Sequence, residues 1–128
     1  MSTLGFRASS LAKKLLKIRR NQYFKTSVKI YFRSCAIDGI QIGYPATLAN
    51  NNISIQDENR FVFEFIYPEK KRMIKISYNK PLLDMMNEFT AIKKTETPSE
   101  IDRYFKKFIK FAQTAKIDTL FIVEDVNI

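Results

Sequence analysis

Hydrophobic and polar residues alternate along residues 23–35, as in a β-strand that buries one face. Val28, Ile30 and Phe32 fall on one side of this strand and predict a core face. The other side is basic and carries one aromatic ring, with the residues Lys25, Lys29, Tyr31 and Arg33. This second side is either the hydrated face of a sheet or a contact surface for a charged partner.

The same alternation predicts shorter strands farther along the chain. We expect these strands at residues 40–44, 53–55, 60–67 and 72–78. Asp38–Gly39 is typical of the tight turn of a β-hairpin, so the first two strands should pair as antiparallel neighbours.

Three phenylalanines share one face of the strand at residues 60–67, namely Phe61, Phe63 and Phe65. Such rings can serve as a platform on which nucleic-acid bases stack. Exposed together, however, they would form a hydrophobic patch of a size that monomeric proteins avoid. We therefore expect them in the core, packed against a helix at residues 98–115.

A period of 3.6 residues predicts helices at residues 9–20, 81–94 and 98–115. Thr97 has the features of an N-cap, because Pro98 follows it and a glutamate stands three positions later. Helix 9–20 is amphipathic and basic, and a start nearer Thr3 stays open as an alternative. Its hydrophobic side holds Leu11, Leu15 and Ile18, and the opposite side holds Lys13, Lys17 and Arg20.

This order of elements predicts an α+β fold. It consists of an N-terminal basic helix, a curved antiparallel sheet of four or five strands, two C-terminal helices that cover one sheet face, and a final short strand. The 128 residues fit a single domain, 1–128. Its expected parts are a helical arm (1–22), the sheet (23–78), the helices (81–116) and the last strand (118–124).

The positive charge is concentrated at one end of the chain. The net charge is +9, and the first 37 residues hold nine lysines and arginines and no acid. The remaining 13 basic and 13 acidic residues cancel one another. Such asymmetry favours a polyanionic partner, either nucleic acid or an anionic membrane surface.

These observations favour a non-enzymatic protein that binds single-stranded DNA or RNA with little sequence preference, because no recognition helix is visible. Tyr31 would stack on an unpaired base, and basic side chains would contact phosphates. The expected nucleic-acid-binding residues are Lys13, Lys17, Arg20, Lys25, Lys29, Tyr31, Arg33, Lys71 and Lys75.

Signatures of enzymes are scarce. The chain has no histidine and one cysteine, Cys35, and it lacks a phosphate-binding glycine loop and zinc-ligand spacing. Asp57 followed by Glu69 and Lys71 has the spacing of a metal-dependent nuclease site, but the latter two residues fall in an expected turn. We therefore expect no enzyme activity, no catalytic residue, no metal site and no cofactor.

Two other functions stay open. One is a structural or protein-interaction module, such as a virion or assembly component, that docks through its basic N-terminal helix. The other, less favoured, is membrane-surface binding by the same helix, which lacks bulky aromatic anchors. The hydrophobic last strand and the high phenylalanine content suggest a homodimer.

The single cysteine favours a reducing, intracellular compartment. Residues 9–20 also resemble a mitochondrial presequence, since they are basic, amphipathic and free of acids, but we favour an integral helix.

Overall fold

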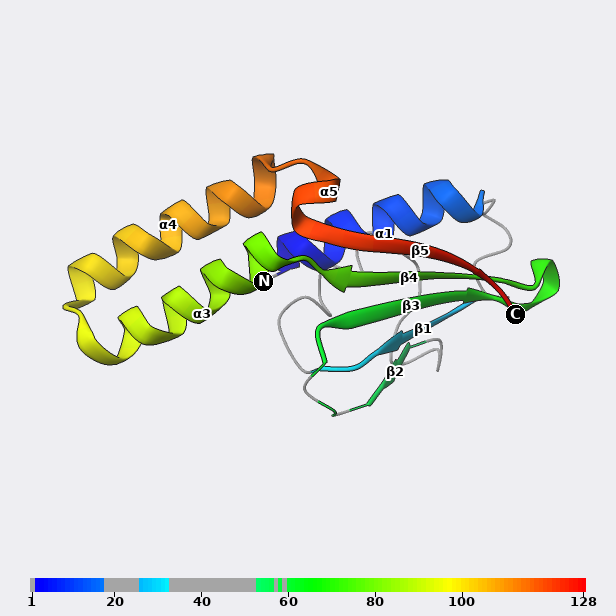
Figure 1. The fold of residues 1–128 in the computed structure, drawn as a ribbon, viewed down its shortest axis with the longest axis horizontal. Helices are drawn as coiled ribbons and strands as arrows, with labels where there is room; N and C mark the ends of the chain where they lie inside the picture. Colours follow the sequence, from blue (N-terminus) through cyan, green and yellow to red (C-terminus); the bar gives the residue numbers. More distant parts are fainter. Residues whose placement is uncertain (1, 18–25, 33–52, 57, 59) are drawn as a thin grey trace. The chain divides into compact units, whose positions relative to one another are not determined.

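The computed structural model describes residues 2–17, 26–32, 53–56, 58 and 60–128. Their contacts divide the chain into two compact units (Figure 1). The first unit comprises Met1–Ser77 and Val123–Ile128, and the second comprises Tyr78–Ile122.

The first unit contains most of a five-stranded sheet with the order β2-β1-β3-β4-β5. The strands are β1 (Ser27–Ile30), β2 (Ile53–Ile55), β3 (Val62–Tyr67), β4 (Arg72–Tyr78) and β5 (Phe121–Asn127). Strand β3 is antiparallel to both β1 and β4. The expected strands at 53–55, 60–67 and 72–78 are therefore present, and β4 has the expected bounds.

The sheet is mixed, whereas we expected antiparallel pairing throughout. Strand β2 runs parallel to β1, with Val28 opposite Ile53 and Ile30 opposite Ile55. A parallel pair needs a connection of about a dozen residues or more, and residues 31–52 provide one. The expected turn at Asp38–Gly39 and the expected strand at 40–44 lie outside the described residues.

The core face of the sheet follows from its alternating sequence. Phe63 and Phe65 on β3 are fully buried, as are Ile74 and Ile76 on β4. Phe61, which we expected beside them, precedes β3 and is 36% exposed. Its ring still contacts Phe32, with 5.2 Å between ring centroids, so it packs at the margin of the core.

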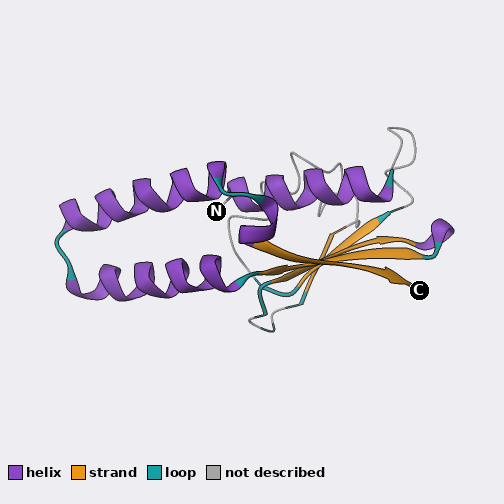
Figure 2. Cartoon of the chain, turned by 45° about the horizontal axis from the view of Figure 1, so that its top comes forward, coloured by secondary structure: helices purple, strands orange, loops and turns teal. Residues whose placement is uncertain are grey.

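Helix α1 (Ser2–Leu16) packs against β3 in the first unit. Figure 2 shows it lying over one side of the strands. It begins seven residues before the expected helix 9–20, and its buried stripe is Leu4, Ala8, Ala12 and Leu16 rather than Leu11 and Leu15, which are half-buried. Small side chains at every fourth position let the helix backbone approach the sheet closely.

The end of α1 is held by a residue from a distant turn. Lys17 takes a left-handed conformation, with φ of 52°, and this ends the helix. Lys70 Nζ, from the 3-10 turn η2 (Pro68–Lys70), donates to the carbonyl oxygens of Leu16 at 3.3 Å and of Lys17 at 3.5 Å. A cation at this position also complements the helix dipole.

The second unit contains α3 (Lys80–Thr95), α4 (Pro98–Thr114) and the short α5 (Ile117–Leu120). The expected cap is present, since the Thr97 hydroxyl accepts a hydrogen bond from the Glu100 N–H at 3.4 Å. Helices α3 and α4 contact one another through a cluster of rings. Phe89 lies 5.7 Å from Tyr104 and 6.1 Å from Phe108, measured between ring centroids.

The predicted fold class is confirmed. The structure is α+β, with an open sheet, helices near both ends of the sequence and a last strand beside β4. Strand β5 begins three residues after the start of the expected segment 118–124, because residues up to Leu120 belong to α5. The expectations that α3 and α4 cover a sheet face, and that 1–128 is one domain, stay predictions. No helix within the described ranges has both the length and the hydrophobicity needed to cross a bilayer.

Candidate functional site

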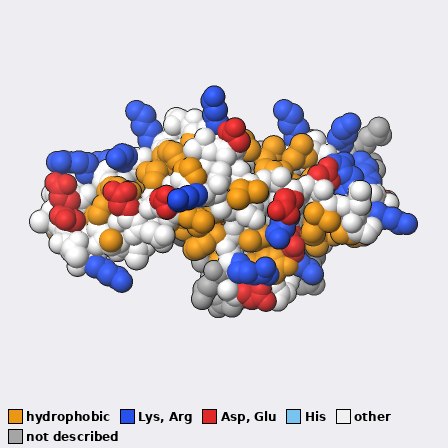
Figure 3. Space-filling model, viewed as in Figure 1, with side chains coloured by type: hydrophobic (Ala, Val, Ile, Leu, Met, Phe, Trp, Pro, Cys, Tyr) orange, Lys and Arg blue, Asp and Glu red, His pale blue; other side chains and the backbone are white. Residues whose placement is uncertain are grey.

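The sheet face that points away from its buried residues carries a row of charged side chains. Register places Lys29 opposite Ser54 on one side and opposite Glu64 on the other, and Glu64 in turn opposite Lys75. Directly opposite residues point to the same side of a sheet, and opposite charges in such pairs are favourable. Figure 3 shows basic, acidic and hydrophobic side chains interspersed over most of the visible surface, with several basic side chains gathered at its right-hand end.

The row continues onto β5. Backbone hydrogen bonds join Asn79 N–H to the Leu120 carbonyl and Ile128 N–H to the Lys71 carbonyl, at 2.8 and 2.9 Å. Both bonds have the same antiparallel register, which places Glu124 opposite Lys75. We call Lys29, Glu64, Lys75 and Glu124 the charged row. Its charges alternate from β1 to β5.

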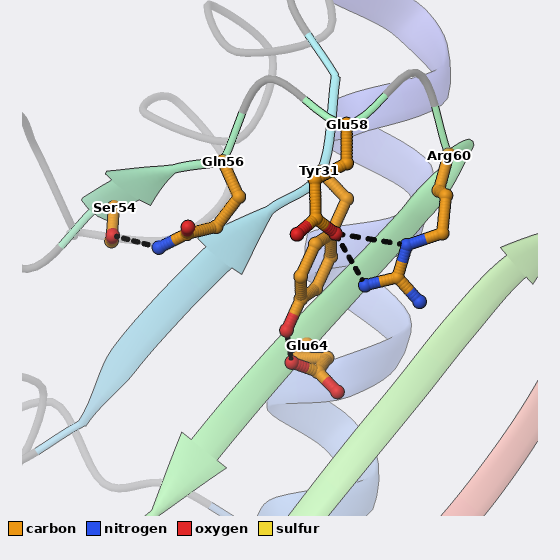
Figure 4. A network of polar contacts seen from close by, with 6 residues as sticks. All are labelled: Tyr31, Ser54, Gln56, Glu58, Arg60 and Glu64. Atoms are coloured by element: carbon orange, nitrogen blue, oxygen red, sulfur yellow. Dashed lines mark hydrogen bonds and ion pairs between the residues drawn. The ribbon is translucent and has the colours of Figure 1, made fainter.

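Tyr31 lies directly after β1 and hydrogen-bonds to the charged row. Its hydroxyl donates to Glu64 Oε1 (Figure 4). This bond, together with partial burial and the negative charge of Glu64, raises the pKa of Tyr31 to about 12. At neutral pH the phenol therefore stays protonated and acts as a hydrogen-bond donor.

Arg60 completes the polar network on this face. Its guanidinium lies over the Tyr31 ring, 4.3 Å from the centroid, and makes a two-pronged contact with Glu58 Oε2 at 2.7 and 3.1 Å. A separate hydrogen bond joins Gln56 Nε2 to the Ser54 hydroxyl, which accepts it at 3.3 Å. Figure 4 shows Glu58, Arg60 and Glu64 gathered around Tyr31, with the pair of Gln56 and Ser54 lying apart from them near β2. The cation–π contact with Arg60 and the hydrogen bond to Glu64 thus hold Tyr31 in one orientation.

The structure brings together only part of the expected site. Lys29, Tyr31 and Lys75 share the outer sheet face, as expected. Lys71 instead lies in the turn before β4, with φ of 51°, because the chain needs a left-handed residue there to enter the strand. Lys13 and Lys17 belong to α1 and its end. Arg20, Lys25 and Arg33 lie outside the described residues.

Sequence reasoning missed Arg60, Glu58 and Glu124. Arg60 and Glu58 are close in the chain, but their contact with Tyr31 depends on the pairing of β1 with β3. Glu124 joins the row only through the pairing of β5 with β4. The sequence did contain a signal for the charged row, namely one glutamate near the middle of β3 and one near the middle of β5, at positions 64 and 124.

No group of three or more potential metal ligands occurs among the described residues. Of the suggested nuclease residues, Asp57 lies outside them, while Glu69 belongs to η2 and Lys71 to the adjoining turn. The second unit has a pocket of about 380 Å³ near the turn between α3 and α4. Its lining residues are Ile92, Glu96, Glu100, Arg103, Tyr104 and Lys107.

A protein-family model described as "FmdE, Molybdenum formylmethanofuran dehydrogenase operon" matches residues 1–122. Three chains of solved structures match as well. One is an FmdE-like protein of the tungsten formylmethanofuran dehydrogenase type from Syntrophus aciditrophicus, with 15% sequence identity and a TM-score of 0.59. The match covers 98% of this chain but only 64% of that protein, and at this identity it shows the fold alone. No curated protein matches.

The family match corrects the expected function. The description of the matched family names the operon of a metabolic enzyme, formylmethanofuran dehydrogenase. The interpretation as a nucleic-acid-binding protein is therefore wrong, and so is nucleic acid as the expected partner. The same finding overturns the interpretation as a virion component. The positive charge of residues 1–37 suggested a nucleic-acid-binding arm. Helix α1, which lies in this segment, instead packs its buried stripe on β3.

Proposed function

We propose that this chain, which belongs to the FmdE family, is a non-catalytic accessory protein that binds a protein partner of a formylmethanofuran dehydrogenase system. The observation that carries the proposal is the family match over residues 1–122. The outer sheet face, with the charged row and Tyr31, is the proposed contact surface.

The chemistry of this face supports binding rather than catalysis. A general acid or base works best with a pKa near the operating pH, and the pKa of Tyr31 is about 12. Glu64 accepts the hydrogen bond of Tyr31, and Glu58 is paired with Arg60. These side chains are held in fixed positions that suit recognition of another surface.

The alternating charges support a protein partner. Lys29 and Lys75 flank Glu64, and Glu124 follows at the edge of the sheet. A polyanion would meet an acid beside each lysine, whereas a protein surface can present complementary charges in alternation. Complementary charge patterns of this kind give an interface its register and its specificity.

The proposal is tested by co-purification. We expect the tagged full chain to retain a purified formylmethanofuran dehydrogenase on an affinity resin. The double variant Lys29→Glu, Lys75→Glu should weaken this retention, because it turns the row into a run of like charges. Loss of one partner in a buried, hydrogen-bonded charge pair costs about 2–5 kcal/mol in binding, and less at an exposed rim.

The matched control is Lys94→Glu, Lys110→Glu, which makes the same change of net charge at exposed positions of α3 and α4. It should bind as the unsubstituted chain does. If the unsubstituted chain retains no part of the dehydrogenase, the proposal is wrong. If both double variants weaken retention equally, the sheet face is not the contact surface.

A further inference from the structure

Strand β5 forms one edge of the sheet within the described residues, and β2 forms the other. Edge strands expose unpaired backbone groups, and proteins normally protect them by making them short or by adding lysine, proline or a bulge. Strand β2 is protected by its length of 3 residues. Strand β5 has 7 residues, Phe-Ile-Val-Glu-Asp-Val-Asn, without lysine, proline or glycine.

The hydrogen bonds of β5 show which backbone groups point outward. In an antiparallel pair, alternate residues bond to the neighbouring strand, and those between them face the other way. Since Leu120 and Ile128 bond to the β4 side, the even-numbered residues of β5 face β4. The N–H and carbonyl groups of Val123, Asp125 and Asn127 therefore point to the open edge.

The side chains of β5 are exposed on both faces. Val123 is 36% exposed on the face of Asp125, and Ile122 is 48% exposed on the face of Glu124. Asp125 is neutralised by Arg72, which lies 2.5 Å away on β4. The described residues show no ion pair for Glu124, although Lys75 of the neighbouring strand β4 stands opposite it.

The charges beside β5 determine which side chain an added strand should carry. The charged row runs from positive Lys29 through Glu64 and Lys75 to negative Glu124. One more strand beside β5 would place a residue opposite Glu124, and a positive charge there would continue the alternation. A glutamate or aspartate in that place would meet a like charge directly opposite, which is destabilising.

We propose that β5 accepts an extended strand of the protein partner along its open edge, with a lysine or arginine of that strand opposite Glu124. This inference rests on the proposed function, since it describes the chemistry of the same partner. Backbone bonds to Val123, Asp125 and Asn127 provide affinity, and the residue opposite Glu124 provides selectivity. This is recognition by β-strand addition.

Two synthetic peptides of the same length as β5 test the inference directly. Both alternate threonine and valine and have capped ends, and they differ only in a central lysine or a central glutamate. With the full chain and millimolar peptide, the lysine peptide should slow amide hydrogen exchange at Val123, Asp125 and Asn127. It should bind roughly three- to tenfold more tightly than the glutamate peptide, because one favourable pair replaces one unfavourable pair.

Two variants separate the backbone contribution from the charge contribution. Val123→Pro removes one outward N–H and should abolish the protection, while Val123→Thr keeps that N–H and should preserve it. Glu124→Lys should reverse the preference, so that the glutamate peptide binds more tightly. This surface substitution also gives a result if the proline variant fails to fold.

Equal binding of both peptides, or unchanged exchange at the three amides, would overturn the inference. These outcomes leave the co-purification result untouched, because a dehydrogenase could still bind elsewhere on the sheet face. Conversely, protection of β5 without any retained dehydrogenase would support the strand site and remove the proposed partner.

Discussion

At the residue scale, the site depends on Tyr31 and Glu64. The two side chains come from strands that are far apart in sequence, and the pairing of β1 with β3 brings them within hydrogen-bonding distance. The bond raises the pKa of Tyr31 to about 12, and the positive charge of Arg60 opposes this rise in part. Tyr31 is therefore both a structural link and a titratable probe of the outer face.

The Glu64→Gln substitution should lower the pKa of Tyr31 from about 12 toward the ordinary value of 10, because it removes the negative charge that accepts the hydrogen bond of the phenol. Phenolate absorbance measured against pH, with Tyr31→Phe to identify the residue, checks this shift. Tyr104, whose pKa is raised to about 12 by burial and by Glu88, serves as an internal control.

The same shift sets a pH window for stability. Because the folded pKa is the higher one, the stabilisation is complete below pH 10 and is lost as pH rises to about 12. A Tyr31 that titrates near 10 in the unsubstituted chain would contradict the role of Glu64.

At the element scale, α1 is positioned by small residues. Ala8 and Ala12 are fully buried one turn apart, between Leu4 and Leu16 at the ends of the stripe. Ser9 is buried beside them and satisfies its hydroxyl by donating to the Phe6 carbonyl at 2.9 Å. Larger side chains on this stripe would force the helix away from β3.

Ala12→Leu should therefore lower the free energy of unfolding by about 1–3 kcal/mol, the usual cost of overpacking a filled core. Urea denaturation followed by circular dichroism measures the change. The matched control is Ala91→Leu at an exposed position of α3, which should change stability by about 0.5 kcal/mol or less. If both variants lost a similar free energy of unfolding, the close contact of α1 with β3 would not explain the small residue at position 12.

At the scale of the whole molecule, net charge was a poor guide to function. The excess of +9 arises within the first 37 residues, and part of that segment is the packed helix α1. The outer sheet face instead alternates in sign from Lys29 to Glu124. A partner would meet this local pattern rather than the overall charge.

Binding of the dehydrogenase should accordingly weaken as salt increases, because salt shortens the range of interaction between exposed charges from about 10 Å at 0.1 M to about 3 Å at 1 M. Titration by calorimetry at several salt concentrations measures this dependence. In Lys29→Glu, Lys75→Glu the dependence on salt should be smaller or inverted. An affinity that does not change with salt would show that the charged row makes no contribution.

Local sequence was sufficient for the type of most described elements, the short helix α5 being an exception. Alternation fixed the bounds of β4, and Thr97 with Pro98 predicted the start of α4, since both signals act between near neighbours. The preferred start of α1 was too late because two of the four residues in its buried stripe are alanine, which hydrophobic periodicity marks weakly. The last strand was found, but the first three residues of the expected segment 118–124 belong to α5.

The sequence by itself thus determined the α+β class, the core face of β3 and β4, and the basic and aromatic character of the outer side that carries Lys29 and Tyr31. Only the tertiary structure decided that β2 is parallel to β1, that Glu64 holds Tyr31, and that Glu124 ends the charged row. Periodicity shows which side of a strand is buried, because it depends on the chain locally. Strand order and register depend on residues far apart in sequence, and they decide which charges become neighbours.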